Sequence, residues 1–240
     1  MFEHMTTAER IQAAKEKTDR VVDHLLYLLA LHENNAIIVY SDTLSSQITY
    51  SRAANAFNVL QGGLHQFEIV RLCALWDRAG EDRESIPTII ELIDLPEVIE
   101  ALAQETLGHH SGIGASEDAA LSALNEEFGQ QRAQKAREEL REAISDVRAI
   151  WSSQRLSSIM NLRHKHLAHS LAQTNLEKKA GLVPPMKYGD EREVLFASLP
   201  IVEALHRLVN GTGFSFEKSQ EIDRNNAEAL WKRCTFDVQG

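Results

Sequence analysis

The densest group of chemically active side chains lies within residues 161–169. This stretch reads Asn-Leu-Arg-His-Lys-His-Leu-Ala-His, and it contains three of the ten histidines of the chain and two cations. An imidazole titrates near neutral pH and transfers protons, whereas a guanidinium offers a planar fork of donors to an anion. The residue types therefore indicate proton transfer beside a bound anionic group.

Helical geometry relates these side chains to one another, because the stretch falls in a predicted helix over residues 157–171. His166 and His169 share one stripe of an ideal helix, and Arg163 lies about 120° away from His169. The arginine side chain is long enough to reach over the face of the histidine, so both could contact one ligand. Lys165 is expected to point elsewhere, toward solvent.

The charge around this stretch differs from the average of the chain. Residues 155–187 contain six cations and one acid, a balance of +5, whereas the whole chain has a formal charge of -10 and the remainder therefore carries -15. The average argues against a general nucleic-acid coat, but a local basic strip fits a polyanionic substrate. Lys165 and Arg155 are the expected substrate-binding cations.

Residues 162–169 resemble a motif of the HEPN superfamily. Arg163 and His169 enclose five residues, with a polar residue directly after the arginine, as in its R-x(4–6)-H motif. The same letters are similar to the LRxKxLAH stretch of the abortive-infection (AbiU-type) branch. Arg71-Leu72-Cys73-Ala74-Leu75-Trp76-Asp77 is similar to an RLxD-like helix of that branch. The resemblance covers roughly residues 10–210.

The resemblance implies a metal-independent endoribonuclease of phage-defence or toxin–antitoxin type, without a cofactor. Such proteins are homodimers whose two motifs face one cleft that binds RNA. Arg163 would bind the scissile phosphate, and His169 would act on the 2′-hydroxyl or the leaving oxygen. His164 would orient one of the pair. The implied products are a 2′,3′-cyclic phosphate and a 5′-hydroxyl.

Further supporting residues and an antitoxin partner follow from the same resemblance. His166 and Asp77 are expected to orient the motif, although Asp77 could equally be a helix-end acid paired with a nearby arginine. One family variant is neutralised when a nucleotidyltransferase modifies a tyrosine two residues beyond the motif histidine. This chain has Leu171 there, so that form of neutralisation is not expected.

Two other interpretations of the motif stay open. His166 and His169, completed by His164, could ligate zinc or nickel, but no cysteine or carboxylate lies nearby, so no metal is predicted. A non-catalytic HEPN-like module could use the same patch to bind RNA, a nucleotide or a protein. The chain lacks a glycine-rich phosphate loop, a GxSxG elbow and paired-carboxylate metal motifs, which argues against ATPases, such hydrolases and two-metal nucleases.

The elements that must position the motif are predicted to be helices only. Five prolines and twelve glycines leave long uninterrupted stretches with helical spacing of apolar residues. This favours an all-α bundle with a HEPN-like domain at residues 1–210 and a C-terminal helical extension at 211–240. The predicted helices cover residues 8–32, 41–60, 64–78, 86–107 with a hinge at Pro96, 116–151, 157–171, 192–210 and 216–236. Between them lie a break at Gly62 and Gly63, a loop at 109–114 and an irregular stretch at 173–189.

Composition limits the remaining possibilities. Residues 130–148 are dense in charge, which is typical of a solvated helix or a projecting helical arm. Cys73 and Cys234 cannot make a disulfide framework, and Cys73 is expected to be buried, as are Trp76 and Trp151. The polar N-terminal residues do not resemble a signal peptide, so a cytoplasmic location is expected.

Overall fold

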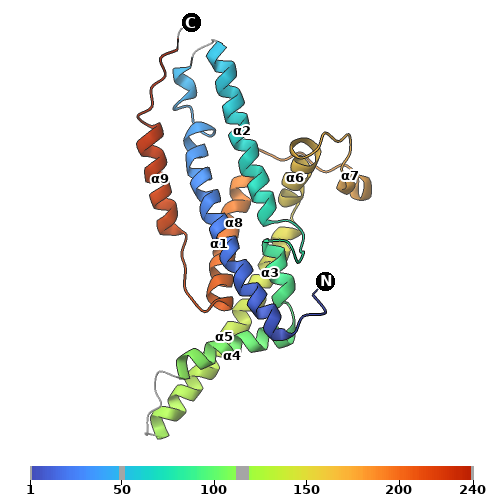
Figure 1. Cartoon of the computed structure of the whole chain (residues 1–240), viewed down its shortest axis with the longest axis vertical. Coiled ribbons are helices and arrows are strands. Elements are labelled where there is room, and N and C mark those ends of the chain that lie inside the picture. Colours follow the sequence, from blue (N-terminus) through green and yellow to red (C-terminus); the bar gives the residue numbers. More distant parts are fainter. Residues whose placement is uncertain (1, 49–51, 112–118, 239–240) are drawn as a thin grey trace. The chain divides into compact units, whose positions relative to one another are not determined.

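The computed structural model describes residues 2–48, 52–111 and 119–238, and all regular secondary structure in these ranges is helical (Figure 1). The predicted all-α fold is confirmed. The chain forms two compact units. Unit 1 comprises Met1–Val22, Trp76–Ser153 and Phe196–Phe214, and unit 2 comprises Asp23–Leu75, Gln154–Leu195 and Ser215–Gly240. Helices α1 (Thr7–Ile38) and α8 (Asp190–Val209) each contribute to both units.

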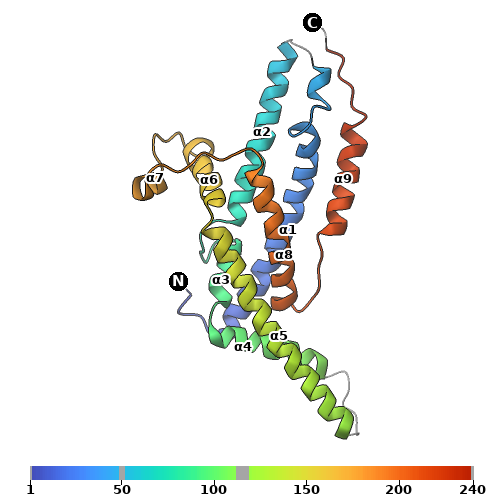
Figure 2. The same cartoon turned by 180° about the vertical axis from the view of Figure 1, so that it is seen from behind.

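Unit 1 is built on a helical hairpin. The side chain of Ser85 caps the N-terminus of α3 (Ile86–Ile93), and α4 (Pro96–Ser111) begins at the predicted hinge, Pro96. Helix α5 (Ala119–Trp151) runs beside α4 (Figures 1 and 2). In its charge-dense part, α5 buries apolar residues at helical spacing against the unit: Ala133, Ala136, Leu140, Ala143, Ile144 and Val147. The charged segment is therefore the packed half of a hairpin, and one of its charges, Arg137, pairs with Glu100 of α4.

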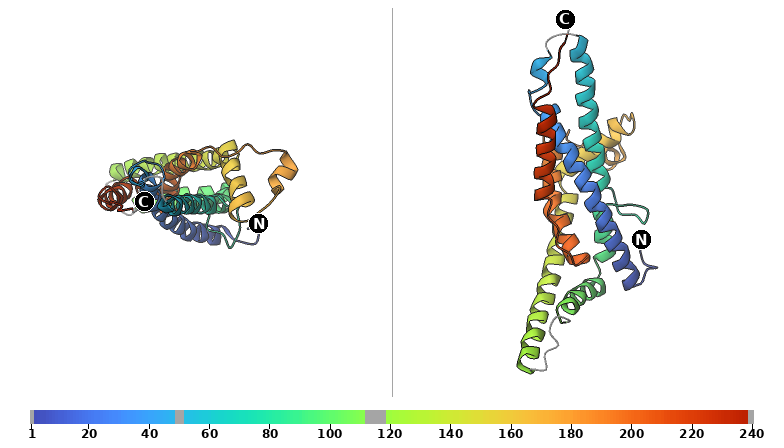
Figure 3. Two further views of the ribbon diagram at one scale, coloured as in Figure 1. Left: turned by 90° about the horizontal axis from the view of Figure 1, so that it is seen from above. Right: turned by 60° about the vertical axis from the view of Figure 1, so that its left-hand side comes forward.

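Unit 2 contains helix α2 (Arg52–Leu75). Helix α9 (Glu217–Trp231) lies alongside α1 (Figures 1 to 3), where Arg224 bonds Glu33 and the Trp231 indole donates to Asn34 over 2.6 Å. Helix α6 (Gln154–Leu162) packs against α2. Residues 211–238 thus include a helix that packs within unit 2, while the division at residue 210 stays a prediction.

Helix α2 corrects the predicted break at Gly62 and Gly63. The helix runs unbroken through both glycines, and it replaces two predicted helices, at 41–60 and 64–78. Among the described residues between α1 and α2, Ser45–Gln47 forms a short 3-10 turn. Each glycine costs about 0.5–1 kcal/mol within a helix. Burial of Phe57 on one side of the pair, and of Ile69 and Leu72 on the other, offsets that cost.

The buried aromatic residues were predicted in part. Trp76 is fully buried, and its indole donates to the Ser198 hydroxyl over 2.9 Å, so its role as a core anchor is confirmed. Trp151 is 41% exposed at the end of α5, and its predicted burial is wrong. Cys73 is buried, as predicted.

The region before α5 was predicted to be a loop followed by a capped helix. Of the predicted loop at 109–114, the first three residues end α4. The rest of that loop and the predicted cap at 116–118 lie outside the described residues. Among the helices that the structure describes, none is long and apolar enough to cross a membrane.

Candidate functional site

The helix that carries the motif arginine changes its winding at the motif. Helix α6 ends at Leu162, and η2 (Arg163–Leu167) is a π-helical turn. The N–H of Ala168 donates to the carbonyl of Arg163 over 2.8 Å, so the bond reaches back five residues where an α-helix reaches four. Such turns are rare within helices and occur frequently at functional sites.

His169 lies in a loop, and the predicted helix over 157–171 therefore ends too late. The N–H of Leu171 donates to the Lys165 carbonyl over 3.0 Å, which folds the loop back onto the π-helical turn. His166 and His169 do not share a helical stripe, and the offset calculated for an ideal helix does not apply. The backbone instead joins the two motif residues through Ala168, which precedes His169 and bonds Arg163.

A buried polar network holds both ends of this loop. Thr174 and Glu177 form a capping box at the start of α7 (Asn175–Ala180). Asn161 of α6 donates to the Glu177 carboxylate over 3.0 Å and accepts from the Thr174 hydroxyl over 2.5 Å. Lys165 donates to the same carboxylate over 2.9 Å. Residues 168–173, which carry His169, are thereby fixed at both ends.

Glu177 is ionised in this network. The hydrogen bond from Lys165, followed by those from Asn161 and the Thr174 backbone, lowers the pKa of the Glu177 carboxyl to about 2. The side chain of Lys165 consequently turns to an internal carboxylate, and its predicted orientation toward solvent is wrong. We call Asn161, Lys165, Thr174 and Glu177 the Glu177 network.

The second predicted substrate-binding cation also has internal partners. Arg155 contacts Asp190 over 3.1 Å and Glu193 over 2.6 Å at the start of α8. Acids just beyond residue 187 therefore offset part of the +5 charge counted in the sequence. Substrate binding by Arg155 and Lys165 stays a prediction.

The motif side chains differ in how far solvent reaches them. His164, His166 and His169 are exposed, whereas Arg163 is half-buried. A ligand in solution can reach these imidazoles directly. In the part of the chain that the structure describes, no group of three or more His, Cys, Asp or Glu side chains is arranged to hold a metal ion.

Asp77 belongs to unit 1 and forms an ion pair with Arg83. It also accepts the N–H of Arg78 over 3.2 Å. The ion pair with Arg83 corresponds to the second interpretation of Asp77, a helix-end acid with an arginine partner. Its role in orienting the motif stays a prediction.

A buried polar cluster in unit 2 was not predicted. The Glu68 carboxylate is 1% exposed and is bonded by three side chains: His32 and Asn35, each over 2.6 Å, and Tyr40 over 2.9 Å. We call these four residues the Glu68 cluster. Glu68 is the only acid in the apolar stretch 64–76, and an acid in such a stretch must find partners. That signal could have revealed the cluster.

A second buried carboxylate lies next to the Glu68 cluster. Glu191 is fully buried, and His65 lies 3.5 Å from it. Burial acts to raise the pKa of Glu191, but hydrogen bonding to His65 and Tyr40 leaves the pKa lowered overall. Burial, together with the charges of Glu68 and Glu191, raises the pKa of Tyr40. The tyrosine therefore remains a proton donor between the two carboxylates.

Comparison with known proteins gives one match. No curated protein and no solved structure is similar enough to count as a relative of the chain. The model of the HEPN AbiU2 family matches residues 11–230, a range that includes Arg163, His169 and the Glu177 network. A match to a HEPN family suggests an RNA-related or abortive-infection role. Because it spans most of the sequence, the chain belongs to the AbiU2 family of HEPN proteins.

Proposed function

We propose that this protein is a metal-independent endoribonuclease of phage-defence or toxin–antitoxin type. Arg163 and His169 act together in a cleft that two chains share. The observation that carries the proposal is the Arg-x(5)-His motif at a π-helical turn, in a chain that belongs to a HEPN family. The π-helical turn supports it because such turns concentrate at functional sites.

The two motif residues suit transesterification of RNA. His169 takes the proton of a 2′-hydroxyl, whose oxygen attacks the phosphorus while the bond to the 5′-oxygen breaks. Arg163 stabilises the charge that develops on the phosphate oxygens. The leaving 5′-oxygen needs a proton, which the His169 of a second chain supplies. The products are a 2′,3′-cyclic phosphate and a 5′-hydroxyl.

The local structure supports these roles for His169. Its side chain is exposed and accessible to an RNA strand, while both ends of its loop are anchored by the Glu177 network. Proton transfer requires the imidazole within hydrogen-bond reach of its target, and anchoring limits the positions that the loop can take. The network therefore acts on His169 through the backbone of the loop.

Analysis of RNA ends tests the reaction type. Single-stranded RNA is incubated with the protein in EDTA, and the fragment ends are identified by their response to phosphatase and kinase. Fragments with 2′,3′-cyclic phosphate and 5′-hydroxyl ends are expected. Fragments with 3′-hydroxyl ends, or cleavage that requires a divalent metal, would contradict the proposal.

One observation favours a second candidate, a non-catalytic module that binds RNA, a nucleotide or a protein. Within the described residues, the His169 side chain has no hydrogen-bond partner, whereas a proton-transferring histidine is ordinarily oriented by a second group. A second chain could supply that group. RNA that binds the wild-type protein and stays intact at saturation would support the binding module.

The toxin–antitoxin aspect has its own test in growing cells. A catalytic toxin slows growth when expressed without an antitoxin protein, and His169→Ala abolishes the effect because proton transfer is lost. Normal growth with the wild-type protein, at an expression level equal to that of the variant, argues against a toxin.

A further inference from the structure

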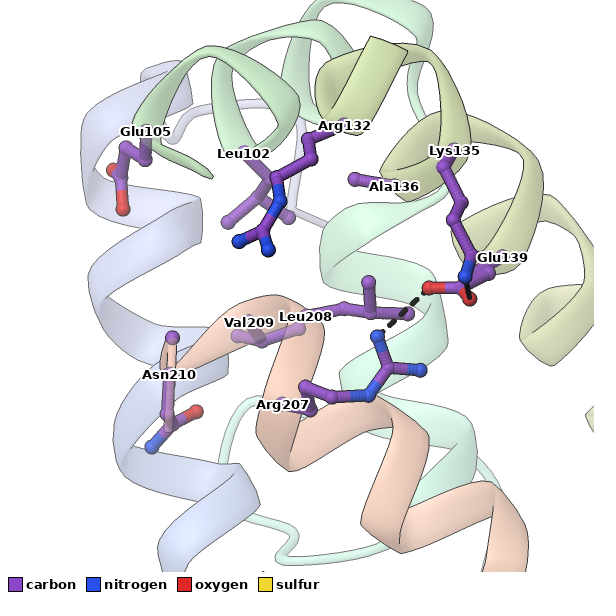
Figure 4. Close-up of a pocket in the computed structure, with 11 residues that line it drawn as sticks. Leu102, Glu105, Arg132, Lys135, Ala136, Glu139, Arg207, Leu208, Val209 and Asn210 are labelled. Carbon is purple, nitrogen blue, oxygen red and sulfur yellow. Dashed lines mark hydrogen bonds and ion pairs between the residues drawn. The ribbon is translucent and has the colours of Figure 1, made fainter. Parts of the chain in front are cut away.

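The cavity between α4, α5 and the end of α8 belongs to unit 1 (Figure 4). It has a volume of about 310 Å³, and two cations on its wall, Lys135 and Arg207, both contact the Glu139 carboxylate, over 3.8 Å and 2.7 Å. None of its lining residues belongs to unit 2, which contains the motif. The π-helical turn of the motif packs against α2, a helix of unit 2. Helix α2 is therefore an element on which a substrate contact near the motif can be built.

An exposed aromatic pair lies where α1 and α2 run side by side in unit 2 (Figures 1 and 3). The Tyr27 ring of α1 and the Phe67 ring of α2 meet edge to face, with centroids 6.3 Å apart and planes inclined by 81°. Tyr27 is 51% exposed and Phe67 is 41% exposed. The two rings therefore present aromatic surface to solvent, on which a planar group can stack.

Arg71 adds a positive charge to the aromatic pair. It lies one helical turn after Phe67 on the same face of α2, and its guanidinium lies over the Tyr27 ring, 5.1 Å from the centroid. Within the residues that the structure describes, Arg71 has no hydrogen bond or ion pair, and its Nε is buried without an acceptor. A buried donor without an acceptor costs free energy, so the side chain favours a ligand with anionic oxygens.

Arg71 differs in this respect from the cations that were expected to bind substrate. Arg155 and Lys165 already contact carboxylates of unit 2. A phosphate that approaches either of them has to displace an ion pair. A phosphate that approaches Arg71 displaces none among the described residues, so the net gain from the contact is larger.

We propose that Tyr27, Phe67 and Arg71 form a subsite for single-stranded RNA on the unit that carries the motif. A base stacks on one ring, and because the ring planes are nearly perpendicular, the other ring packs against the edge of that base or its sugar. The Arg71 guanidinium donates to the oxygens of an adjacent phosphate. The inference rests on the proposed ribonuclease, because it assigns part of the substrate contact of that enzyme.

Fluorescence anisotropy with a labelled 2′-O-methyl RNA oligonucleotide measures the subsite without cleavage, because this RNA lacks the hydroxyl that attacks the phosphate. The full chain is expected to bind the single strand. A blunt duplex of the same sequence should bind at least about tenfold more weakly, because paired bases cannot stack on the rings. No binding of the single strand overturns the proposal, as does equal affinity for the duplex.

Two substitutions at Tyr27 separate stacking from apolar contact. Tyr27→Leu keeps an apolar side chain but removes the ring, and it should weaken binding of the single strand about tenfold. Tyr27→Phe keeps the ring and should leave the affinity unchanged. Circular dichroism establishes that both variants fold. Equal affinities in these two variants would contradict stacking on Tyr27.

The salt dependence of binding tests the phosphate contact of Arg71. Arg71→Gln should weaken binding about tenfold and reduce the slope of log affinity against log salt concentration by about 0.7, the value for one phosphate of a single strand. Arg52→Gln removes an exposed cation at the other end of the same helix and should change neither quantity. A slope in Arg71→Gln equal to that of the wild type would contradict the phosphate contact.

The binding and cleavage assays distinguish failure of the subsite from failure of the ribonuclease. Weaker binding in Tyr27→Leu and Arg71→Gln, without RNA cleavage by the wild-type protein, would support the subsite and overturn the ribonuclease. Cleavage by the wild-type protein, with wild-type affinity in both variants, would overturn the subsite alone.

Discussion

Glu177 is the residue on which the geometry of the motif loop most depends. Its carboxylate accepts hydrogen bonds from Asn161, Lys165 and the Thr174 backbone, and these residues lie on both sides of His169 in the chain. The Asn161 bond spans 16 positions, so local sequence patterns do not reveal it. The motif itself could be predicted from residue types and spacing. The hydrogen-bond network that holds the motif loop could not be predicted in this way.

Glu177→Gln should lower the stability of the protein in a pH-dependent way. The folded pKa of about 2 lies below the ordinary 4.5, so the ionised carboxylate stabilises the fold above pH 4.5, and this contribution is lost as the pH falls toward 2. Urea midpoints of wild type and variant should therefore differ most near pH 7 and converge below pH 3.

An exposed acid of the same unit provides the control for Glu177→Gln. Glu193 is exposed and contacts Arg155, so Glu193→Gln should change the midpoint little at any pH. A difference between wild type and Glu177→Gln that stays constant from pH 7 to pH 2 would show that the carboxylate charge is not what stabilises the loop.

At the scale of elements, α2 shows why glycine is an uncertain signal of a helix end. At Gly62, an added Cβ would meet no heavy atom within 4 Å. Gly62→Ala should therefore stabilise the protein by about 0.4–1 kcal/mol, because it restricts the unfolded chain without a clash. Gly181 has a φ of +84°, so Gly181→Ala should destabilise. Urea unfolding of both variants measures the contrast, and a destabilising Gly62→Ala would contradict a continuous α2.

The Glu68 cluster joins α1, the segment after it and α2. Glu68→Ala leaves the buried His32 and Asn35 and the half-buried Tyr40 without the carboxylate that they share, and removal of one partner from a buried charged network costs about 3–5 kcal/mol. Gln66→Ala changes an exposed residue on the same helix and should cost less than about 0.5 kcal/mol. Equal urea midpoints for these two variants would rule out the cluster as a major source of stability.

For the molecule as a whole, the all-α fold could be predicted from the helical spacing of the apolar residues. The first helix, the hinge at Pro96 and the long helix that ends at Trp151 were predictable because each has a local cause: a stripe, a proline or an uninterrupted pattern. The end of η2 at Leu167 could not be predicted, because no glycine or proline follows within the loop. The loop is held instead by the Glu177 network, whose bonds join residues distant in the sequence.

Part of the basic strip is neutralised by internal ion pairs in the folded chain. The strip at 155–187 is basic in sequence, but Arg155 and Lys165 are already bound to carboxylates of unit 2. Phosphate contacts through such cations have to displace these partners, so non-specific affinity for RNA should be low. Recognition then depends on the motif more than on a general basic surface.

Single-turnover cleavage of RNA in EDTA measures directly whether Arg163 and His169 perform metal-independent catalysis. We expect cleavage by the wild-type protein and a rate roughly 10²–10⁴-fold lower in Arg163→Ala and in His169→Ala, both still folded by circular dichroism. Lys179→Ala, which removes an exposed cation of α7, should keep the wild-type rate. Wild-type rates in both motif variants would contradict the ribonuclease proposal, as would loss of all cleavage in EDTA with recovery in Mg²⁺.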